Sequence, residues 1–474
     1  MMHISAYIDG QWHENDKTFP VLNPYDGSEL AQVTDCGSEE TKLAIEAAAQ
    51  AFPKWSAQTA AHRSRRLRKW YELIVENVDE LAELLTKEQG KPLSEAKAEI
   101  KYGASFIEWF AEEGKRVYGD TIPASTADKR IVVIKQAVGV VAAITPWNFP
   151  SAMITRKVAP ALAVGCTVVI KPAEDTPLSA LALADLAHQA GFPPGVLNVV
   201  PGSDPEAIGE VLTQHPSVRK LSFTGSTAVG KLLMEQCAGT LKRLSMELGG
   251  NAPFIVFQDA DIDKAVDGAM AAKYRNGGQT CICANRFYAH ASVYDAFVEK
   301  LTAKTKQLQL GNGLQEGTDI GPLINSDGLE KVARLVEDAK RKGAHAVTGG
   351  QKSEVGDQFY EPTVLTRVST DMDLVDKEIF GPVCPVFRFE SEEEVVKLAN
   401  ATNVGLAAYF YGNNYARIWR VAEALEYGMV GINTGRISAA QAPFGGVKES
   451  GFGREGSKYG LEDFLVKKYL CWGL

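Results

Sequence analysis

The sequence predicts an α/β protein built from two doubly wound, mainly parallel sheets, and two observations lead to this prediction. From residue 138 onward, short apolar runs of strand length alternate with segments of helical length, which is typical of a doubly wound parallel sheet. The alternation starts again after Gly249 and Gly250, which indicates a second sheet of the same kind. A chain of 474 residues is long enough for two or three domains.

The strands of the first series are continuous apolar runs, which suit strands buried on both faces of a sheet. A glycine, Gly191, gives one of the helices a stop signal. Expected strands lie at 138–144, 167–170, 196–200, 220–223 and 252–257, and expected helices at 178–190, 228–238 and 261–274.

Two β-rich segments, 130–136 and 465–472, do not fit the alternation of strands and helices. We expect both to pair outside the main sheets, and pairing across subunits stays open. They predict a small additional β element.

The composition is that of an ordinary soluble globular protein, with 45% hydrophobic and 23% charged residues. A formal net charge of −9 argues against nucleic acid or an anionic membrane as a partner, because both require a basic surface. No apolar run reaches the ~18–20 residues that span a bilayer, and the first residues lack the pattern of a signal or transit peptide. The seven cysteines form no disulfide framework, so we expect a reducing compartment and a cytoplasmic protein.

A phosphate-binding turn is suggested by residues 223–230, which follow an expected strand and open an expected helix. Gly225 would let the backbone come close to a phosphate, and the helix N-terminus would supply free N–H groups beside Ser226. The segment has neither the G-x-G-x-x-G fingerprint nor the lysine of a Walker loop. Taken alone, such a turn is more often an ordinary helix N-cap.

A candidate nucleophile, Cys281, follows Gly277 and Gly278 at the end of an expected helix. The alternatives are an inert buried thiol or, together with Cys283, a metal ligand. No second cluster of Cys or His lies nearby in the sequence, so no metal is expected. No histidine setting supports a Cys–His hydrolase.

Two polar residues could assist such a nucleophile. Glu247 has apolar neighbours, so burial would raise its pKa toward the range of a general base, whereas the alternative is a carboxylate that faces solvent. Asn148 lies between Pro146 and Pro150, which would hold its amide still enough to stabilise an oxyanion. The alternative is an asparagine that satisfies the backbone of a turn.

Six ordered motifs together resemble the aldehyde dehydrogenase superfamily, and the resemblance runs essentially end to end. The motifs are PWNFP at 146–150, KPAE at 171–174, FTGST at 223–227, ELGG at 247–250, GQTC at 278–281 and EIFGP at 378–382. The resemblance implies a dinucleotide-binding domain (1–120 and 138–249), a catalytic domain (250–445) and a β oligomerisation arm (121–137 and 446–474). It also implies a homodimer or homotetramer.

The resemblance implies oxidation of an aldehyde to a carboxylic acid. Cys281 would attack the aldehyde to form a thiohemiacetal, and the Asn148 side chain and the Cys281 backbone N–H would stabilise the oxyanion. Hydride transfer to a nicotinamide dinucleotide would leave a thioester, and Glu247 would activate the water that hydrolyses it. A cysteine thioesterase or esterase is the alternative from another class, but it leaves the cofactor motifs without a role.

The resemblance also assigns a cofactor site. It places the pyrophosphate at the Gly225 turn, the adenosine ribose at Lys171 and Glu174, and the nicotinamide ribose at Glu378. Because a carboxylate accepts hydrogen bonds from ribose hydroxyls and repels a 2′-phosphate, Glu174 favours NAD, with NADP as the less favoured alternative. The full set is Thr145, Pro146, Trp147, Lys171, Glu174, Gly225, Ser226, Gly230, Glu378 and Phe380.

Within the superfamily, the stretches 151–157, 273–276 and 453–460 look most like those of succinate-semialdehyde dehydrogenases. A route of 4-aminobutyrate degradation would suit such an enzyme. In that subgroup, residues matching Arg156, Arg275 and Ser438 hold the distal carboxylate of the substrate. Guanidinium suits this role because it offers paired donors with a permanent charge, although either arginine could instead form an ordinary surface ion pair.

Two features keep alternatives open. The subgroup usually has Leu or Ile where this chain has Arg436, so glutarate semialdehyde or another small anionic aldehyde remains a candidate substrate. Cys283 could form a reversible disulfide with Cys281, and the strained ring would make that bond easy to reduce. A plain thiol that lines the pocket is the alternative for Cys283.

Overall fold

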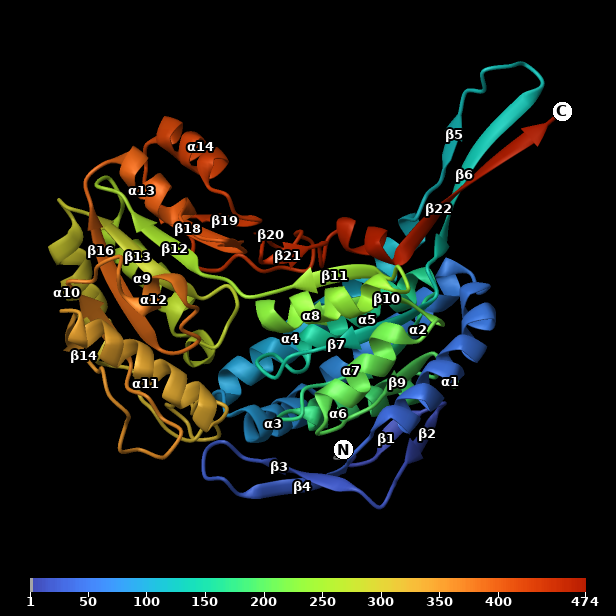
Figure 1. Ribbon diagram of the computed structural model, residues 1–474, viewed down its shortest axis with the longest axis horizontal. Coiled ribbons are helices and arrows are strands. Elements are labelled where there is room, and N and C mark those ends of the chain that lie inside the picture. The colour runs from blue at the N-terminus through green and yellow to red at the C-terminus, as the bar shows by residue number, and fades with distance from the viewer. Residues whose placement is uncertain (1–2) are drawn as a thin grey trace.

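The computed structural model describes residues 3–474 and contains two lobes, each built around one large sheet (Figure 1). A narrow strand arm projects from the first lobe and carries the C-terminus. The predicted fold class, two mainly parallel α/β sheets with a small β arm, is confirmed. Across the described residues, no helix is long and apolar enough to cross a membrane.

The first sheet has eight strands, and its centre is parallel. Antiparallel strands close both of its edges. In spatial order the strands are β2 (Gln11–His13), β1 (Ala6–Ile8), β9 (Leu197–Val199), β8 (Thr167–Lys171), β7 (Val140–Ile144), β10 (Val218–Thr224), β11 (Arg243–Glu247) and β21 (Gly451–Phe452).

Helices cover both faces of this sheet because side chains of each strand alternate between the two faces. In β7, Val141 and Ala143 join the apolar core beneath α2, α4, α5 and α6, whereas Val140 and Ala142 join the core beneath α1, α7 and α8. The helices of this lobe are α1 (Ser38–Ser56), α2 (Ala60–Glu76), α3 (Val78–Gln89), α4 (Leu93–Glu113), α5 (Ala152–Val164), α6 (Pro177–Gln189), α7 (Pro205–Gln214) and α8 (Thr227–Ala238), with a short 3-10 turn η1 (Gly114–Arg116).

The second sheet repeats this plan with seven strands. Phe254 faces the core under α9 and α10, and its neighbour Ile255 faces the core under α11 to α14. The strands in spatial order are β14 (His345–Thr348), β15 (Thr363–Thr366), β16 (Val383–Phe389), β13 (Ala284–His290), β12 (Ala252–Val256), β18 (Ala407–Tyr411) and β19 (Met429–Ile432). The helices are α9 (Ile262–Lys273), α10 (Tyr294–Thr305), α11 (Ser326–Arg341), α12 (Asp373–Asp376), α13 (Glu392–Asn400) and α14 (Tyr415–Ala424), with a 3-10 turn η2 (Arg275–Gly278). A further 3-10 turn, η3 (Tyr459–Phe464), packs on the first lobe, where Leu461 and Phe464 join the core.

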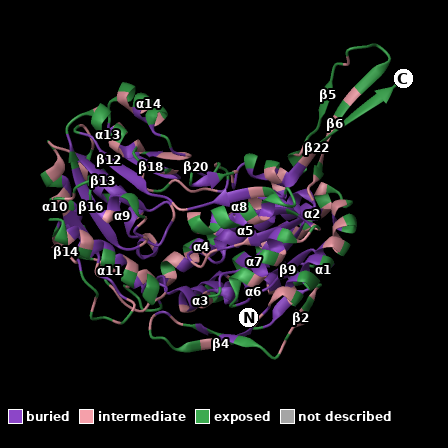
Figure 2. Ribbon diagram, in the orientation of Figure 1, coloured by how far each residue is buried: buried purple, intermediate pink, exposed green. Residues whose placement is uncertain are grey.

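The arm contains the two β-rich segments, 130–136 and 465–472, that did not fit the alternation of strands and helices. β6 (Lys129–Ala137) and β22 (Leu465–Gly473) pair antiparallel along their whole length within one chain, and β5 (Asp120–Ile122) adds a third strand. The arm is mostly exposed (Figure 2), and Val132, Leu470 and Trp472 are among its exposed apolar residues. Its role in assembly remains a prediction.

A hairpin of β3 (Thr18–Leu22) with β4 (Glu29–Thr34) and a short antiparallel pair of β17 (Val404–Gly405) with β20 (Val447–Lys448) complete the fold. The β3–β4 hairpin borders a cavity between the lobes. The parallel strands of the first sheet direct their carboxyl ends toward the second lobe (Figure 1), which is where ligands bind in open α/β sheets.

Candidate active site

A cavity of about 210 Å³ lies at the carboxyl ends of the first sheet and brings together most of the residues that the sequence singled out. The first lobe contributes the loop after β7, the turn after β10 and the end of β11. The second lobe contributes the Cys281 loop and the segment after α12. The shared residues are Pro146, Trp147, Asn148, Gly225, Ser226, Glu247, Cys281, Glu378 and Phe380.

The Cys281 loop depends on an unusual backbone path. Asn276, Gly277 and Gly278 all have positive φ values, of 52°, 61° and 79°. Asparagine and glycine adopt this left-handed conformation at little cost. A Cβ at residue 278 would lie 2.2 Å from the carbonyl oxygen of Gly381, so the close approach to that neighbouring loop also requires glycine.

The Cys281 thiol is only partly exposed, and its surroundings disfavour the charged form. Burial raises the pKa of this thiol to about 12, and the positive charge of Arg156 is the largest influence in the opposite direction. The thiol is therefore protonated near neutral pH until other groups enter the site.

Glu247 is buried at the end of β11, with 3% of its surface exposed. Neither of its carboxylate oxygens has a hydrogen-bond partner among residues 3–474. Burial, followed by the nearby charge of Glu455, raises the pKa of Glu247 well above its ordinary value. The structure therefore favours the buried, base-like carboxyl over the solvent-facing alternative.

Asn148 has its amide group fixed from one side. Its Nδ2 atom donates a hydrogen bond to the carbonyl oxygen of Gln279 at 3.0 Å, and 5% of the residue is exposed. A side-chain amide carries two N–H groups, so one N–H remains for a ligand beside Cys281. This geometry fits oxyanion stabilisation better than a simple turn asparagine.

The same cavity has features that fit the nicotinamide half of a dinucleotide. Burial raises the pKa of the Glu378 carboxyl to about 7, and this carboxyl accepts a hydrogen bond from the N–H of Gly250 at 3.1 Å. Phe380 has a positive φ of 55° and packs edge-on against Trp147, with ring centroids 5.5 Å apart. A carboxylate beside a planar aromatic wall can bind the two hydroxyls of a ribose and border a flat ring.

The turn after β10 has the form expected of a phosphate site. Ser226 caps α8 by accepting a hydrogen bond from Val229 N–H, and Gly225 precedes it at the mouth of the cavity. Gly230 lies one turn into α8, where a Cβ would clash with Leu248, so its role is close helix packing. The helix N-terminus is thus free to meet a phosphate.

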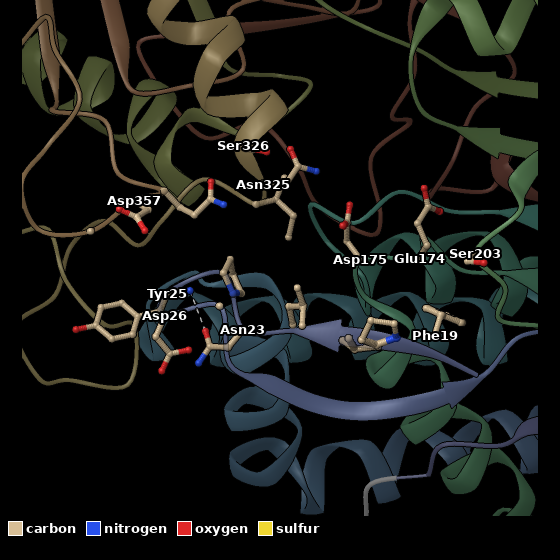
Figure 3. A pocket seen from close by; sticks show the side chains of 18 residues that line it. Phe19, Asn23, Tyr25, Asp26, Glu174, Asp175, Ser203, Asn325, Ser326 and Asp357 are labelled. Atoms are coloured by element: carbon tan, nitrogen blue, oxygen red, sulfur yellow. Dashed lines mark hydrogen bonds between the residues drawn. The ribbon is translucent and has the colours of Figure 1, made fainter. Parts of the chain in front are cut away.

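Glu174 lies in a different place, where it lines a separate cavity of about 650 Å³ between the lobes (Figure 3). Lys171 is buried and donates a hydrogen bond to Glu174 at 2.9 Å, and its carbonyl oxygen accepts one from the N–H of Thr145 at 3.1 Å. Figure 3 shows the side chain of Glu174 directed into the opening, across from Asn325 at the start of α11.

A third, smaller cavity lies on the other side of Cys281 and contains Arg156, Arg275 and Ser438. Arg156 is 1% exposed, which rules out the surface ion pair considered for it. Its guanidinium lies 2.7 Å from a Glu455 oxygen and 3.9 Å from the Phe444 ring centroid.

Arg275 is half-buried, and its guanidinium lies 5.2 Å from the ring centroid of Phe149. The two arginines share one small cavity with Cys281. The cavity has a volume of about 20 Å³, and its two guanidinium groups give it a lining that favours an anion.

Several residues of the site carry no sequence signal of their own. Tyr102 of α4 lines the small cavity, and its hydroxyl hydrogen-bonds to Ser438. Glu455 holds both Arg156 and Lys157, and Lys331 of α11 lines the first cavity beside Phe380. Of these residues, only Lys157 and Glu455 lie in the stretches 151–157 and 453–460 that resemble succinate-semialdehyde dehydrogenases, and the sequence predicted no function for either.

The Cys283 thiol is buried, and Lys273 Nζ lies 3.3 Å from its sulfur. Burial raises the pKa of this thiol. These observations do not test a reversible disulfide between Cys283 and Cys281, which remains a prediction.

Comparison with known proteins agrees with this geometry. The family model described as "Aldehyde dehydrogenase family" matches residues 12–470. A glutarate-semialdehyde dehydrogenase of Pseudomonas putida is 60% identical over 98% of this chain and 97% of its own length. An NADP(+) succinate-semialdehyde dehydrogenase of Escherichia coli K12 is 58% identical over 99% and 98% of the two chains. The crystal structure of a succinate-semialdehyde dehydrogenase from Burkholderia pseudomallei has a TM-score of 0.99 and 60% identity, covering 100% of this chain and 98% of that one.

The fold and these matches define an oxidoreductase that uses NAD(P). The chain belongs to the aldehyde dehydrogenase family, and it is an aldehyde dehydrogenase. Oxidation is therefore favoured over the cysteine hydrolase considered from the sequence.

The raised pKa of Cys281 predicts slow alkylation of the ligand-free protein. Because only the thiolate reacts, the rate at Cys281 should be very low near pH 7 and rise about tenfold per pH unit up to about pH 10. The rate is measured by iodoacetamide labelling and peptide mass spectrometry, with the exposed Cys471 as internal reference. Labelling of Cys281 as fast as Cys471 near neutral pH would contradict the described environment.

Proposed function

We propose that this enzyme oxidises succinate semialdehyde to succinate, with NAD as its preferred cofactor. The observation that carries the proposal is the placement of Arg156, Arg275 and Ser438 in one small cavity with Cys281. Two guanidinium groups beside a hydroxyl suit a carboxylate, and the sulfur beside them suits the aldehyde carbon at the other end of a short molecule.

The proposed chemistry uses three side chains in turn. The Cys281 thiol gives up its proton to water, and the thiolate sulfur then forms a bond to the aldehyde carbon. The carbonyl oxygen becomes an oxyanion, which accepts a hydrogen bond from the remaining N–H of Asn148. The nicotinamide, when bound, supplies the acceptor for the hydride that leaves this carbon. Glu247 then takes a proton from water as the water oxygen attacks the thioester, and the sulfur leaves as the acid is released.

Residues of the first cavity and of the larger cavity between the lobes would hold the cofactor. Glu378 would bind the nicotinamide ribose, the α8 N-terminus at Ser226 the pyrophosphate, and Glu174 the adenosine ribose. A carboxylate at Glu174 accepts two ribose hydroxyls and repels a 2′-phosphate. This supports NAD over NADP, although one of the similar enzymes is named for NADP(+).

Glutarate semialdehyde is a second candidate substrate, and Arg436 is the observation that favours it. Arg436 is exposed. Burial raises the pKa of Glu95, and the positive charges of Lys91, Arg275 and Arg436 act against that rise. Arg436 and Arg275 thus both act on the Glu95 carboxylate. An added cation there would suit a longer anionic substrate, and one of the similar enzymes is named for glutarate semialdehyde.

Replacing Arg275 with leucine should weaken the binding of an anionic aldehyde selectively. We expect KM for succinate semialdehyde to rise about 10- to 100-fold, since a charge-assisted hydrogen bond contributes roughly 1.5–3 kcal/mol. The readout is NADH formation, with butanal as the neutral substrate and the five-carbon semialdehyde run in parallel. Arg388→Leu, on the exposed edge of β16, is the matched control. An equal loss toward butanal would refute recognition of the carboxylate by Arg275.

Replacing Glu174 with serine should move cofactor preference toward NADP. The Glu174 side chain is 46% exposed, so solvent screening limits its repulsion of a 2′-phosphate, and we expect about a tenfold change in the ratio of kcat/KM for the two cofactors. The exposed Glu206→Ser on α7 is the matched control. An unchanged ratio would remove Glu174 as the selectivity determinant.

A further inference from the structure

A fully buried ion pair lies beside the loop that carries Asn148. Lys91, in the connection between α3 and α4, and Glu99 of α4 both have side chains with 0% exposure, and their charged atoms are 2.6 Å apart. The Lys91 ammonium also donates a hydrogen bond to the backbone oxygen of Asn148 at 2.8 Å, and it lies 3.9 Å from the ring centroid of Phe149.

The second oxygen of Glu99 holds the residues that follow. It accepts hydrogen bonds from the N–H groups of Ser151 and Ala152, at 3.0 and 3.2 Å, where α5 begins. A carboxylate is favourable at a helix N-terminus, because the N–H groups there have no partner within the helix. The ion pair therefore fixes the chain on both sides of Phe149.

The same region of α4 also reaches the Cys281 loop. Glu95 accepts a hydrogen bond from the Asn276 N–H at 2.7 Å, and the Asn276 side chain donates to the Asn148 backbone oxygen at 2.9 Å. The Asn148 amide in turn donates to the Gln279 oxygen at 3.0 Å. Asn148 is thus held at its backbone by two donors and at its side chain by one acceptor, which leaves its second N–H in one direction.

A contribution to folding stability does not by itself explain why Lys91 and Glu99 are buried as an ion pair. Removing two charges from water costs about as much as their attraction returns, and apolar residues of similar volume often serve a core equally well or better. An ammonium group does what an apolar side chain cannot: it fixes the carbonyl oxygen of Asn148.

We propose that Lys91 and Glu99 are positioning residues that aim the Asn148 amide at the oxyanion formed on Cys281. This role rests on the proposed function, because it requires that Asn148 stabilise such an oxyanion. Neither residue touches the reacting atoms, so their effect on catalysis must pass through Asn148. That requirement makes the proposal testable by a double-mutant cycle.

The test measures kcat, KM for both substrates and the melting temperature in Lys91→Met, Glu99→Gln and the double variant, each with and without Asn148→Ala. Methionine keeps the length and apolar stem of lysine. We expect Lys91→Met to lower kcat about 10- to 100-fold, with both KM values changed less than about threefold. In the Asn148→Ala background, the same change should lower kcat less than about twofold.

The double variant separates positioning from folding. It removes both charges of the pair, so it should regain melting temperature without regaining kcat. Lys97→Met, which removes an exposed ammonium of α4 that pairs with Asp79, is the matched control and should leave kcat unchanged.

Equal slowing by Lys91→Met in the presence and absence of Asn148, or wild-type kcat in the double variant, would overturn the proposal while leaving the proposed function intact. A wild-type enzyme that oxidises no anionic aldehyde would instead overturn the proposed function and this role with it.

Discussion

The contact between Gly250 and the carbonyl oxygen of Cys281 determines how the two lobes meet. A Cβ at residue 250 would lie 2.4 Å from that oxygen, so the strand leaving the first sheet can reach the Cys281 loop only through glycine. The N–H of the same glycine binds Glu378, and the carbonyl oxygen of Gly249 accepts a hydrogen bond from Ser450. Three distant parts of the chain therefore converge within a few residues of Glu247.

This convergence also sets the electrostatics of the site. Burial raises the pKa of both Glu247 and Cys281, so the surroundings of both groups disfavour their charged forms. The nearest buried cations, Arg156 and Lys157, are partly engaged by Glu455. The charges of the site therefore already balance one another before an anionic substrate and the cofactor enter. The charged groups of the substrate and the cofactor would then change the reactivity of Cys281 and Glu247.

The sequence predicted the central elements of both sheets because continuous apolar runs and glycine stops are local signals. It gave no elements for the first 129 residues, where α1 to α4 cover one lobe. The β-rich segments at 130–136 and 465–472 were placed outside the main sheets, but that they pair with each other is a tertiary fact. Strand pairing over such a separation leaves no local trace in the sequence.

Some residues of the site could likewise be predicted from the sequence, and others could not. Cys281, Glu247 and Asn148 were found because each lies in a distinctive short motif. Tyr102 and Lys91 were not, because a tyrosine within a helix or a lysine in a connection looks like any surface residue until the fold places it at the site. Local sequence patterns predict local backbone conformation. Which side chains of α4, α5 and the Cys281 loop come together depends on the tertiary packing of the core.

The most direct test of the account is to trap the covalent intermediate. Glu247→Gln enzyme is mixed with succinate semialdehyde and NAD, quenched in acid and mapped by peptide mass spectrometry. We expect one succinyl group, attached as a thioester to the Cys281 peptide and formed only when NAD is present. An unmodified Cys281 peptide, or a succinyl group on another residue while the wild-type enzyme turns over, would contradict it.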